Sequence, residues 1–581
     1  IGFIYQLSRH LRDWTIVMLL FFFTGAAIVI YLNQTPYQPR ERDYAYVGSF
    51  YAFAIWIGLG VYALFDAARR VTTREVTYVV GGAIGLGVLR YLVETIGDDD
   101  HAISYTIMIM AAMGGAAVWA FHLMGRAVKN DTVVGALASL LCLAVPAVMV
   151  AEEWDDHDRS LRTPARDLAS DHLNSCAPNA ILFTNGDNDT FPLWYAQEVE
   201  GIRTDVRVVN LSLLNTDWYI DQQRRRAYES APIPMGMAPE KYRQGTRDVI
   251  ALLPASNDDS APYTDLKSAM DFALNDRNMR ELFTRGKKDA WFRTNKFSIP
   301  VNKDRVIANG TVLAKDSASI ADAVRWKIGK QVLLKNHFAV LDLLANFNWE
   351  RPIYFAVTTG PDSYVNLQSW FQLEGLTYRL VPIQTNSRTP NRSGRVGTDV
   401  MYDNVTNKFV WGHMDTDQPL YLDENVLRMT TNLRLQMANL ADALIEEGRK
   451  DSALKVLDIS IDRMPEHNVP YDQVIIPTIE AYYKAGGMEK GDRLTERLFD
   501  VMEKNMEWYL SLDPAFAERV EDEMSIAHAV MERMVSTSSG VYKRPLGDSL
   551  RSRFDAIDTA FEEKMQEIQE GSRRRTTKAR F

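Results

Sequence analysis

The sequence contains little cysteine, no large basic face and no long apolar run after residue 152. Its two cysteines are Cys142, inside an apolar run, and Cys176, in the polar part, so we expect no disulfide between them, and cysteine does not indicate a redox compartment. The net charge of -10 and the pI near 5.6 argue against a nucleic-acid binder. The one basic cluster lies in residues 571–581, which we expect to be a disordered tail.

At 581 residues the chain is too long for one hydrophobic core, so several domains are expected. Its hydrophobic content of 46% is concentrated before residue 152, and the remainder is typical of a soluble protein. The first residue is Ile1 and not methionine, so we expect the chain to be a fragment or a processed product.

The apolar runs before residue 152 are long enough to span a bilayer, since roughly 19 helical residues cover about 28 Å. The predicted transmembrane helices are residues 14–32, 47–65, 76–93, 103–124 and 133–151. The first is too long for a cleaved signal peptide, and no small-residue cleavage site follows it.

Basic residues in the short loops predict the orientation of these helices. They lie before the first helix, after the second and after the fourth: Arg9, Arg12, Arg69, Arg70, Arg74, Arg126 and Lys129. These segments, and with them the amino terminus, are therefore predicted to be cytoplasmic. Loop 33–46, loop 97–101 and everything after residue 151 would lie outside, which in a bacterium is the periplasmic side of the inner membrane.

The charged end of loop 33–46 is the candidate lipid-phosphate site. Four consecutive charges and a tyrosine follow two prolines there: Arg40, Glu41, Arg42, Asp43 and Tyr44. A guanidinium matches phosphate oxygens bidentately and binds best where water is partly excluded, so Arg40 and Arg42 are the candidate ligands and the other three are their support. The alternative is that ion pairs among these residues only lock a tight loop.

Arg90 lies near the outer end of the third predicted helix, on the same side as this loop. An ionisable residue in a membrane helix usually faces a partner or a cavity, so Arg90 is a third candidate phosphate ligand. Glu94 is four residues away, and a helical ion pair with a snorkelling arginine is the favoured alternative. The acidic run 154–158 contains one histidine and is typical of a solvated helix exit, so we assign no metal site.

From residue 179 the pattern changes to strand, helix, strand. Residues 180–184 form a buried-strand run, 185–189 a turn, and 206–211 a second strand. The candidate ligand-binding residues of the turn are Asp187, Asn188, Asp189 and Thr190, because open α/β sheets bind ligands at the carboxyl ends of their strands. The favoured alternative is a helix cap in which Asp189 or Thr190 accepts hydrogen bonds from free amides.

Residues 353–383 have a similar plan, with a strand, a turn at 359–362, a helix from residue 363 and a returning strand at 376–383. We interpret the two units as an internal repeat within one mixed sheet spanning about residues 160–400. After residue 421 the pattern is helical. Helices at 433–447, 451–464, 473–484 and 490–510 recur at a spacing of about 39 residues and predict tetratricopeptide-like hairpins, which offer concave surfaces for peptides.

Three parts of the chain together resemble the large bacterial membrane proteins related to protein O-mannosyltransferases of the GT-C glycosyltransferase class. They are NQTPYQPRERDYAYVGSFYAFAIWIGLG, ILFTNGDNDTFPLWYAQEVEGIRTDVRVVNLSLLNTDWYI and the helical repeats. The resemblance implies transfer of a sugar from a polyprenyl phosphate to a hydroxyl, with a carboxylate as general base and the lipid phosphate as leaving group. It also implies that the acidic catalytic residue belongs to an amino-terminal part, which we expect to lie outside this chain.

The sequence therefore predicts a multi-domain membrane protein. It consists of a five-helix transmembrane bundle (1–151), an α/β periplasmic domain (152–420), all-α tetratricopeptide-like repeats (421–570) and a basic tail (571–581). The predicted function is that of the carboxyl-terminal part of a membrane glycosyltransferase that moves a mannose-like sugar to Ser or Thr hydroxyls of envelope proteins. Its partners would be the bilayer, the polyprenyl-linked sugar and the acceptor proteins, with no nucleic acid and no cofactor. The alternatives are a non-enzymatic membrane-anchored scaffold and a periplasmic ligand sensor.

Overall fold

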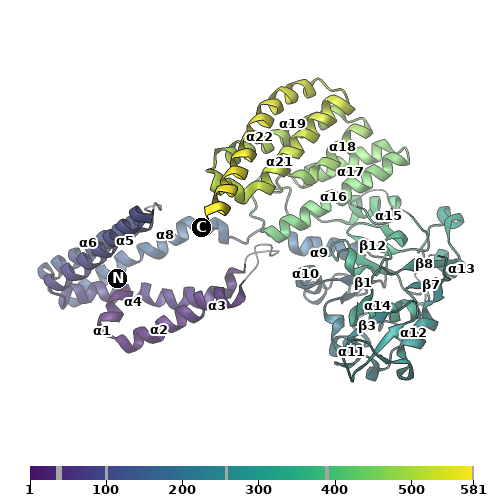
Figure 1. Cartoon of the computed structure of the whole chain (residues 1–581), viewed down its shortest axis with the longest axis horizontal. Helices are drawn as coiled ribbons and strands as arrows, with labels where there is room; N and C mark the ends of the chain where they lie inside the picture. The colour runs from purple at the N-terminus through teal and green to yellow at the C-terminus, as the bar shows by residue number, and fades with distance from the viewer. Residues whose placement is uncertain (34–41, 98–101, 255–259, 386–391, 579–581) are drawn as a thin grey trace. The chain divides into compact units, whose positions relative to one another are not determined.

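A computed structural model of the chain divides into two compact units, Ile1–Arg159 and Ser160–Phe581. It describes residues 1–33, 42–97, 102–254, 260–385 and 392–578. We describe each unit by itself (Figure 1).

The first unit is entirely helical in its described residues. Its helices are α1 (Gly2–Arg9), α2 (Leu11–Phe23), α3 (Ala26–Leu32), α4 (Val47–Arg69), α5 (Thr73–Gly97), α6 (Ala102–Ala127), α7 (Asp131–Cys142) and α8 (Ala144–His157). Helix α4 is central, because it packs against α1, α2, α6 and α7. The buried indole of Trp56 in α4 donates a hydrogen bond of 2.7 Å to the side chain of Gln6 in α1.

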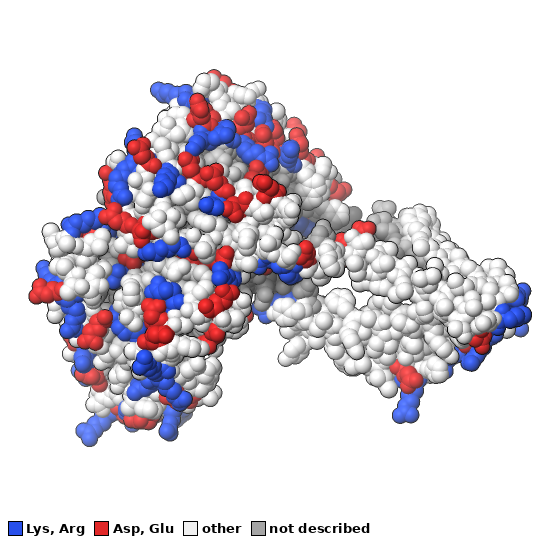
Figure 2. Space-filling model, turned by 180° about the vertical axis from the view of Figure 1, so that it is seen from behind, with Lys and Arg blue, Asp and Glu red and all other residues white. Residues whose placement is uncertain are grey.

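Five helical segments of this unit are long and apolar enough to cross a membrane, as the sequence predicts. They are Leu11–Leu32, Tyr44–Arg69, Thr73–Thr95, Ile103–Ala127 and Asp131–Trp154. The first and last are each built from two helices, with breaks at Thr24–Gly25 and Leu143. Figure 2 shows the unit as an almost uncharged surface whose Lys, Arg, Asp and Glu gather at its extremities, which suits a hydrocarbon surrounding.

The second unit opens with α9 (Pro164–Asn174) and is built on a six-stranded mixed sheet of order β13-β11-β12-β10-β1-β2. Its strands are β1 (Ile181–Thr184), β2 (Arg207–Asn210), β10 (Ile353–Ala356), β11 (Phe371–Leu373), β12 (Thr377–Leu380) and β13 (Arg395–Val396). Strand β1 pairs in parallel with both β10 and β2, whereas β12 runs antiparallel to β10. Every residue of β1, β2 and β10 is buried, so both faces of this sheet are covered.

The predicted strand-helix-strand unit is confirmed as β1, α10 (Asp187–Glu198) and β2. In the second predicted unit the two strands are confirmed as β10 and β12, but the helix between them is wrong. In place of a helix from residue 363 there are two short 3-10 turns, Pro361–Ser363 and Gln368–Trp370, followed by an antiparallel hairpin of β11 and β12. Val365 and Asn366 adopt positive φ angles of 44° and 64°, which interrupt a helix. The proposed internal repeat therefore fails at this point.

The segment between β2 and β10 forms a large insertion. It carries two smaller sheets, of order β5-β6-β3-β9 and β4-β7-β8. Its strands are β3 (Val249–Leu252), β4 (Thr264–Asp265), β5 (Arg280–Glu281), β6 (Lys288–Phe292), β7 (Lys296–Pro300), β8 (Ala323–Lys327) and β9 (Val332–Leu334), and its helices are α11 (Asp217–Gln223), α12 (Leu266–Leu274), α13 (Lys303–Ala308) and α14 (Lys335–Asn346).

The remainder of the unit is helical, as predicted, and its last helix runs to Lys578, so the expectation of a disordered tail from residue 571 is wrong for the described residues. After α15 (Thr398–Asp403) come α16 (Glu424–Glu446), α17 (Lys450–Arg463), α18 (Ile476–Ala485), α19 (Met488–Ser511), α20 (Pro514–Ala517), α21 (Glu521–Val535) and α22 (Leu546–Lys578). Helix α16 packs against α17 and α18, and α19 packs against α18, α21 and α22 (Figure 1). The four expected helices correspond to α16–α19, while their tetratricopeptide character and the domain boundary at residue 421 stay predictions.

Candidate functional site

The carboxyl ends of three parallel strands meet at one edge of the main sheet. Strand β1 lies between β10 and β2, and all three point the same way. The chain passes from β1 to β2 on one side and later returns to β10 on the other, so the direction of strand order reverses at β1. This is the topological switch point at which open α/β sheets form their ligand crevice.

The turn that follows β1 leads directly into α10. Gly186 is the residue before the helix and has φ 80° and ψ −178°, a conformation that residues with a side chain avoid. Asp187–Thr190 then form the first helical turn. No side chain caps the helix at Gly186 itself. The Asp189 carboxylate accepts a hydrogen bond from the backbone amide of Asn185, as the helix-cap alternative expects, whereas the Thr190 hydroxyl donates and does not cap. Two acidic residues, Asp187 and Asp189, nevertheless lie where the helix dipole favours negative charge.

Thr190 is a structural residue of this turn. Its buried hydroxyl donates to the carbonyl oxygen of Gly186 at 2.7 Å and lies 2.8 Å from the hydroxyl of Thr184. The side-chain amide of Asn210, at the end of β2, donates to both the Thr190 hydroxyl and the Gly186 carbonyl at 2.9 Å. These bonds tie the ends of β1 and β2 together and saturate Thr190, so it is not available to a ligand.

The other three predicted residues face outward to different degrees. Asp187 and Asn188 are exposed, and the Asn188 amide lies 3.4 Å from the Asn425 side-chain oxygen at the start of α16. Asp189 is half-buried. Burial raises the pKa of its carboxyl to about 6, against the lowering effect of the Thr358 hydroxyl and the Asn185 amide. A carboxylate that titrates near neutrality can accept a hydrogen bond from a hydroxyl, or take its proton.

Thr358 and Asn185 are functional candidates that the sequence reasoning missed. Thr358 follows β10 and meets Asp189 across the switch point, while Asn185 accepts a 2.8 Å hydrogen bond from Ser212, beyond β2. Asn185 directly follows β1, and Thr358 lies two residues beyond β10. Their polar side chains at strand ends were the available signal, but the pairing of β1 with β10 could not be read from the sequence.

The predicted lipid-phosphate residues belong to the first unit. Arg40 and Glu41 lie outside the described residues. Arg42 and Tyr44 are exposed, and Asp43 begins the short 3-10 helix Asp43–Tyr46 that leads into α4.

Arg90 lies in the second half of α5. Its Nε atom donates to the Glu94 carboxylate at 2.7 Å, and the Glu94 side chain is 0% exposed. This is the helical ion pair that we considered as the alternative to phosphate binding. An arginine that already neutralises a buried carboxylate is a weaker phosphate ligand.

Residues 165–400, which contain the sheet edge and the insertion, match the family model described as TMEM260-associated domain 2. No curated protein matches the chain, and no solved structure matches it. The match and the five apolar helices are compatible with a membrane protein related to glycosyltransferases.

Proposed function

We propose that the chain is the carboxyl-terminal part of a membrane glycosyltransferase that transfers a mannose-like sugar from a polyprenyl phosphate to Ser or Thr hydroxyls of envelope proteins at the periplasmic face. The observation that carries the proposal is that membrane-length helices and a TMEM260-associated domain match occur in the same chain. Five helices able to cross a membrane precede a domain that matches the TMEM260-associated model over residues 165–400. The resemblance to protein O-mannosyltransferases gives this combination its chemistry.

The donor phosphate belongs, in this proposal, to Arg40 and Arg42. Negative charge develops on the lipid phosphate as the sugar leaves, and a fixed guanidinium stabilises that charge best where water is scarce. Arg90 was the third candidate, but it forms a 2.7 Å ion pair with Glu94, so we prefer the two loop arginines as phosphate ligands. Arg90 therefore serves mainly to keep Glu94 neutralised within α5.

The sheet edge is the proposed acceptor surface. Asp189 presents a half-buried carboxylate at the switch point, beside the hydroxyl of Thr358. A carboxylate and a hydroxyl in this arrangement suit hydrogen bonding to hydroxyl groups of a sugar or of a Ser or Thr acceptor. The same chemistry supports a second candidate function, that of a periplasmic sensor for a hydroxylated ligand.

Transfer of radiolabelled mannose from a polyprenyl phosphate to envelope proteins tests the proposal in the full-length parent. We expect the Arg40→Gln, Arg42→Gln double variant to lose transfer while it still folds and inserts. The matched control is Arg12→Gln with Arg126→Gln, which removes two exposed arginines from the predicted cytoplasmic side.

Failure of the parent to transfer any sugar, with envelope proteins still bound, would favour the scaffold instead. One observation supports that reading. A cavity of about 680 Å³ lies among α16, α18 and α21, and its walls include the apolar side chains of Leu435, Ile476, Ile526 and Val530. A groove of this kind on stacked helices can accept a peptide.

A further inference from the structure

A second cavity, of about 230 Å³, lies along the unpaired side of β2, the outermost strand of the main sheet. It is separate from the carboxyl ends of the strands, where the candidate site lies. Its walls come from α10, β2, α11 and the segment 227–230. They include the polar side chains of Gln197, Thr204, Arg207, Gln223 and Tyr228. A polar cavity of this size can hold a small metabolite or a group of ordered waters.

Strand β2 ends its sheet, so one side of its backbone has no strand partner. Side chains replace that partner on both sides of Val208. The side-chain amide of Gln197 donates to the carbonyl oxygen of Val206 at 2.8 Å, and the Tyr219 hydroxyl accepts from the backbone N–H of Asn210 at 2.9 Å.

Val208 itself is 4% exposed and lines the cavity. The amides of Arg207 and Leu211 donate to β1, so the N–H and C=O of Val208 point away from β1, towards the free edge. Neither group has a hydrogen-bond partner among the described residues. Buried backbone groups are almost always paired, so a donor and an acceptor are left here for a guest.

Arg207 supplies positive charge to the same cavity. It is 5% exposed, and its Nε and Nη2 atoms donate only to uncharged oxygens: the Ser230 hydroxyl and the carbonyls of Arg225, Ser230 and Ala231. Among the residues that the structure describes, no carboxylate forms an ion pair with it. Burial lowers the pKa of Arg207, and the neighbouring Arg351 is bonded in the same way to carbonyl oxygens.

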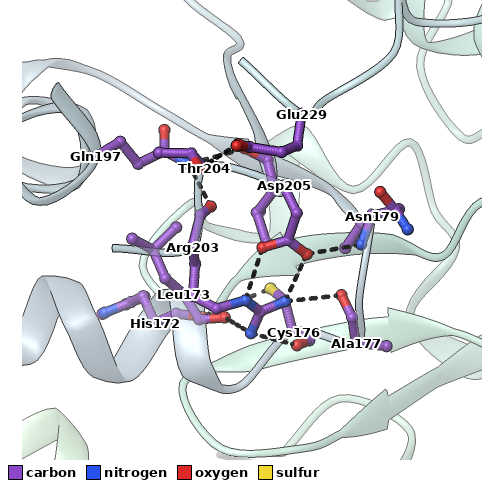
Figure 3. A network of polar contacts seen from close by, with 12 residues as sticks. His172, Leu173, Cys176, Ala177, Asn179, Gln197, Arg203, Thr204, Asp205 and Glu229 are labelled. Atoms are coloured by element: carbon purple, nitrogen blue, oxygen red, sulfur yellow. Dashed lines mark hydrogen bonds and ion pairs between the residues drawn. The ribbon is translucent and has the colours of Figure 1, made fainter. Parts of the chain in front are cut away.

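The adjacent Arg203 shows that the fold neutralises arginines here when their role is structural. Figure 3 shows its guanidinium held bidentately by Asp205, at 2.8 and 3.0 Å, and bonded to the carbonyls of Leu173, Cys176 and Ala177. Arg207, four residues along the chain, lacks such a carboxylate. A buried charge without a counter-ion is costly, and an anionic ligand removes that cost.

Two further side chains define what else the ligand carries. Gln223 is 4% exposed; its side-chain amide is hydrogen-bonded to the Tyr219 hydroxyl, and its Oε1 atom has no partner within the described part of the chain. Glu198 lies at the exposed rim, where it accepts a hydrogen bond from Tyr228. The interior of the cavity is thus positive with one free acceptor, and its only acidic lining residue in the described chain is at the mouth.

We propose that this cavity is a binding site for a small oxyanion, the phosphate or carboxylate group of a hydroxylated metabolite. The Nη1 atom of Arg207, which makes no hydrogen bond to the described residues, and the N–H of Val208 would hold the anion, and Gln223 would accept from a hydroxyl. The site is independent of the proposed transfer reaction.

The test is isothermal titration of the full chain, in a maltoside detergent free of phosphate head groups, with inorganic phosphate and separately with acetate. We expect saturable binding of at least one of them, and the tighter one identifies the group. Gln223→Glu places a carboxylate of the same shape in the cavity, so we expect it to weaken binding at least about tenfold while the protein still folds. Glu198→Gln should tighten binding, because it removes a repelling charge from the mouth.

Arg207→Gln should abolish binding, and Arg434→Gln controls for loss of a buried arginine as such. Arg434 is 0% exposed, bonds to the carbonyls of Met464 and Val469, and lies in α16, outside the cavity. Its variant should bind the anion as the parent does. No saturable binding of either anion, binding unchanged by Gln223→Glu, or binding weakened by Glu198→Gln would each overturn the proposal, the last by indicating a cationic guest.

Discussion

Replacement of Asp189 by asparagine tests the electrostatics of the sheet edge. Burial raises the pKa of this carboxyl from 3.8 to about 6 in the folded protein. In the unfolded chain the carboxyl ionises near its ordinary value, so the folded state is progressively disfavoured as the pH rises from about 4 to 6. The penalty is complete only well above pH 6, where the folded carboxyl is fully ionised. About two pKa units correspond to about 3 kcal/mol, and we expect about 1–3 kcal/mol because the carboxyl keeps some solvent contact.

The assay is thermal unfolding of the full chain at pH 4.5 and pH 7.5. Asp189→Asn should raise the melting temperature at pH 7.5, whereas at pH 4.5, where the native carboxyl is protonated, the parent and the variant should unfold within a degree or two of each other. Asp187→Asn is the matched control, since it removes an exposed carboxyl from the same turn and should change stability by less than about 0.5 kcal/mol.

A fall in melting temperature at pH 7.5 for Asp189→Asn would refute this reasoning. It would mean that the ionised carboxylate makes favourable contacts that outweigh its burial. The expected gain has a functional meaning, because binding sites commonly retain groups that cost stability. A carboxylate that destabilises the fold at neutral pH is better explained by a ligand than by packing.

Two further predictions concern buried ion pairs. Arg90→Gln should destabilise the helical unit by about 1–3 kcal/mol, because it leaves the fully buried Glu94 carboxylate without its arginine. The double variant with Glu94→Gln should recover most of that loss, as measured by thermal melting in detergent. If Arg90 binds the lipid phosphate instead, this stable double variant would lack sugar transfer. Glu374→Gln should lower the free energy of unfolding by about 3–5 kcal/mol, because the buried carboxylate accepts a hydrogen bond from Tyr354 at 2.6 Å and lies 3.7 Å from Arg379. Denaturant unfolding measures this loss, and a change below about 1 kcal/mol would contradict the prediction.

The strongest periodic signals in the sequence predict the fold best. Apolar runs of about 19 residues correctly indicate the five membrane-length helices, because the length and composition of each run are sufficient for the prediction and no distant contact is needed. The strand and helix within residues 180–198 are equally local and are confirmed, although the helix begins at Asp187, inside the predicted turn 185–189. The segment 363–370 fails because its helix signal comes from aromatic residues that pack into the sheet region, while left-handed residues at Val365 and Asn366 prevent helix formation.

The candidate site is only half predictable for a related reason. Asp187–Thr190 stand out because they follow a buried strand, but the role of each depends on partners far along the chain. Thr190 is saturated by Asn210, whereas Asp189 meets Thr358, about 170 residues away. The pairing of β1 with β10 across a large insertion brings these residues together. Local sequence carries no signal for that pairing.

The donor-phosphate residues and the acceptor surface of the proposed enzyme can be tested separately by measuring two products, sugar transferred to protein and sugar released by hydrolysis. Cleavage of the polyprenyl phosphate sugar requires stabilisation of the leaving phosphate, so Arg40→Gln with Arg42→Gln should remove both transfer to protein and slow hydrolysis to free sugar. Asp189→Asn affects only hydrogen bonding at the acceptor surface, so transfer should fall while hydrolysis persists. Equal loss of both products in both variants would place Asp189 in the sugar-cleavage step, and unchanged transfer in Asp189→Asn would remove the sheet edge from acceptor recognition.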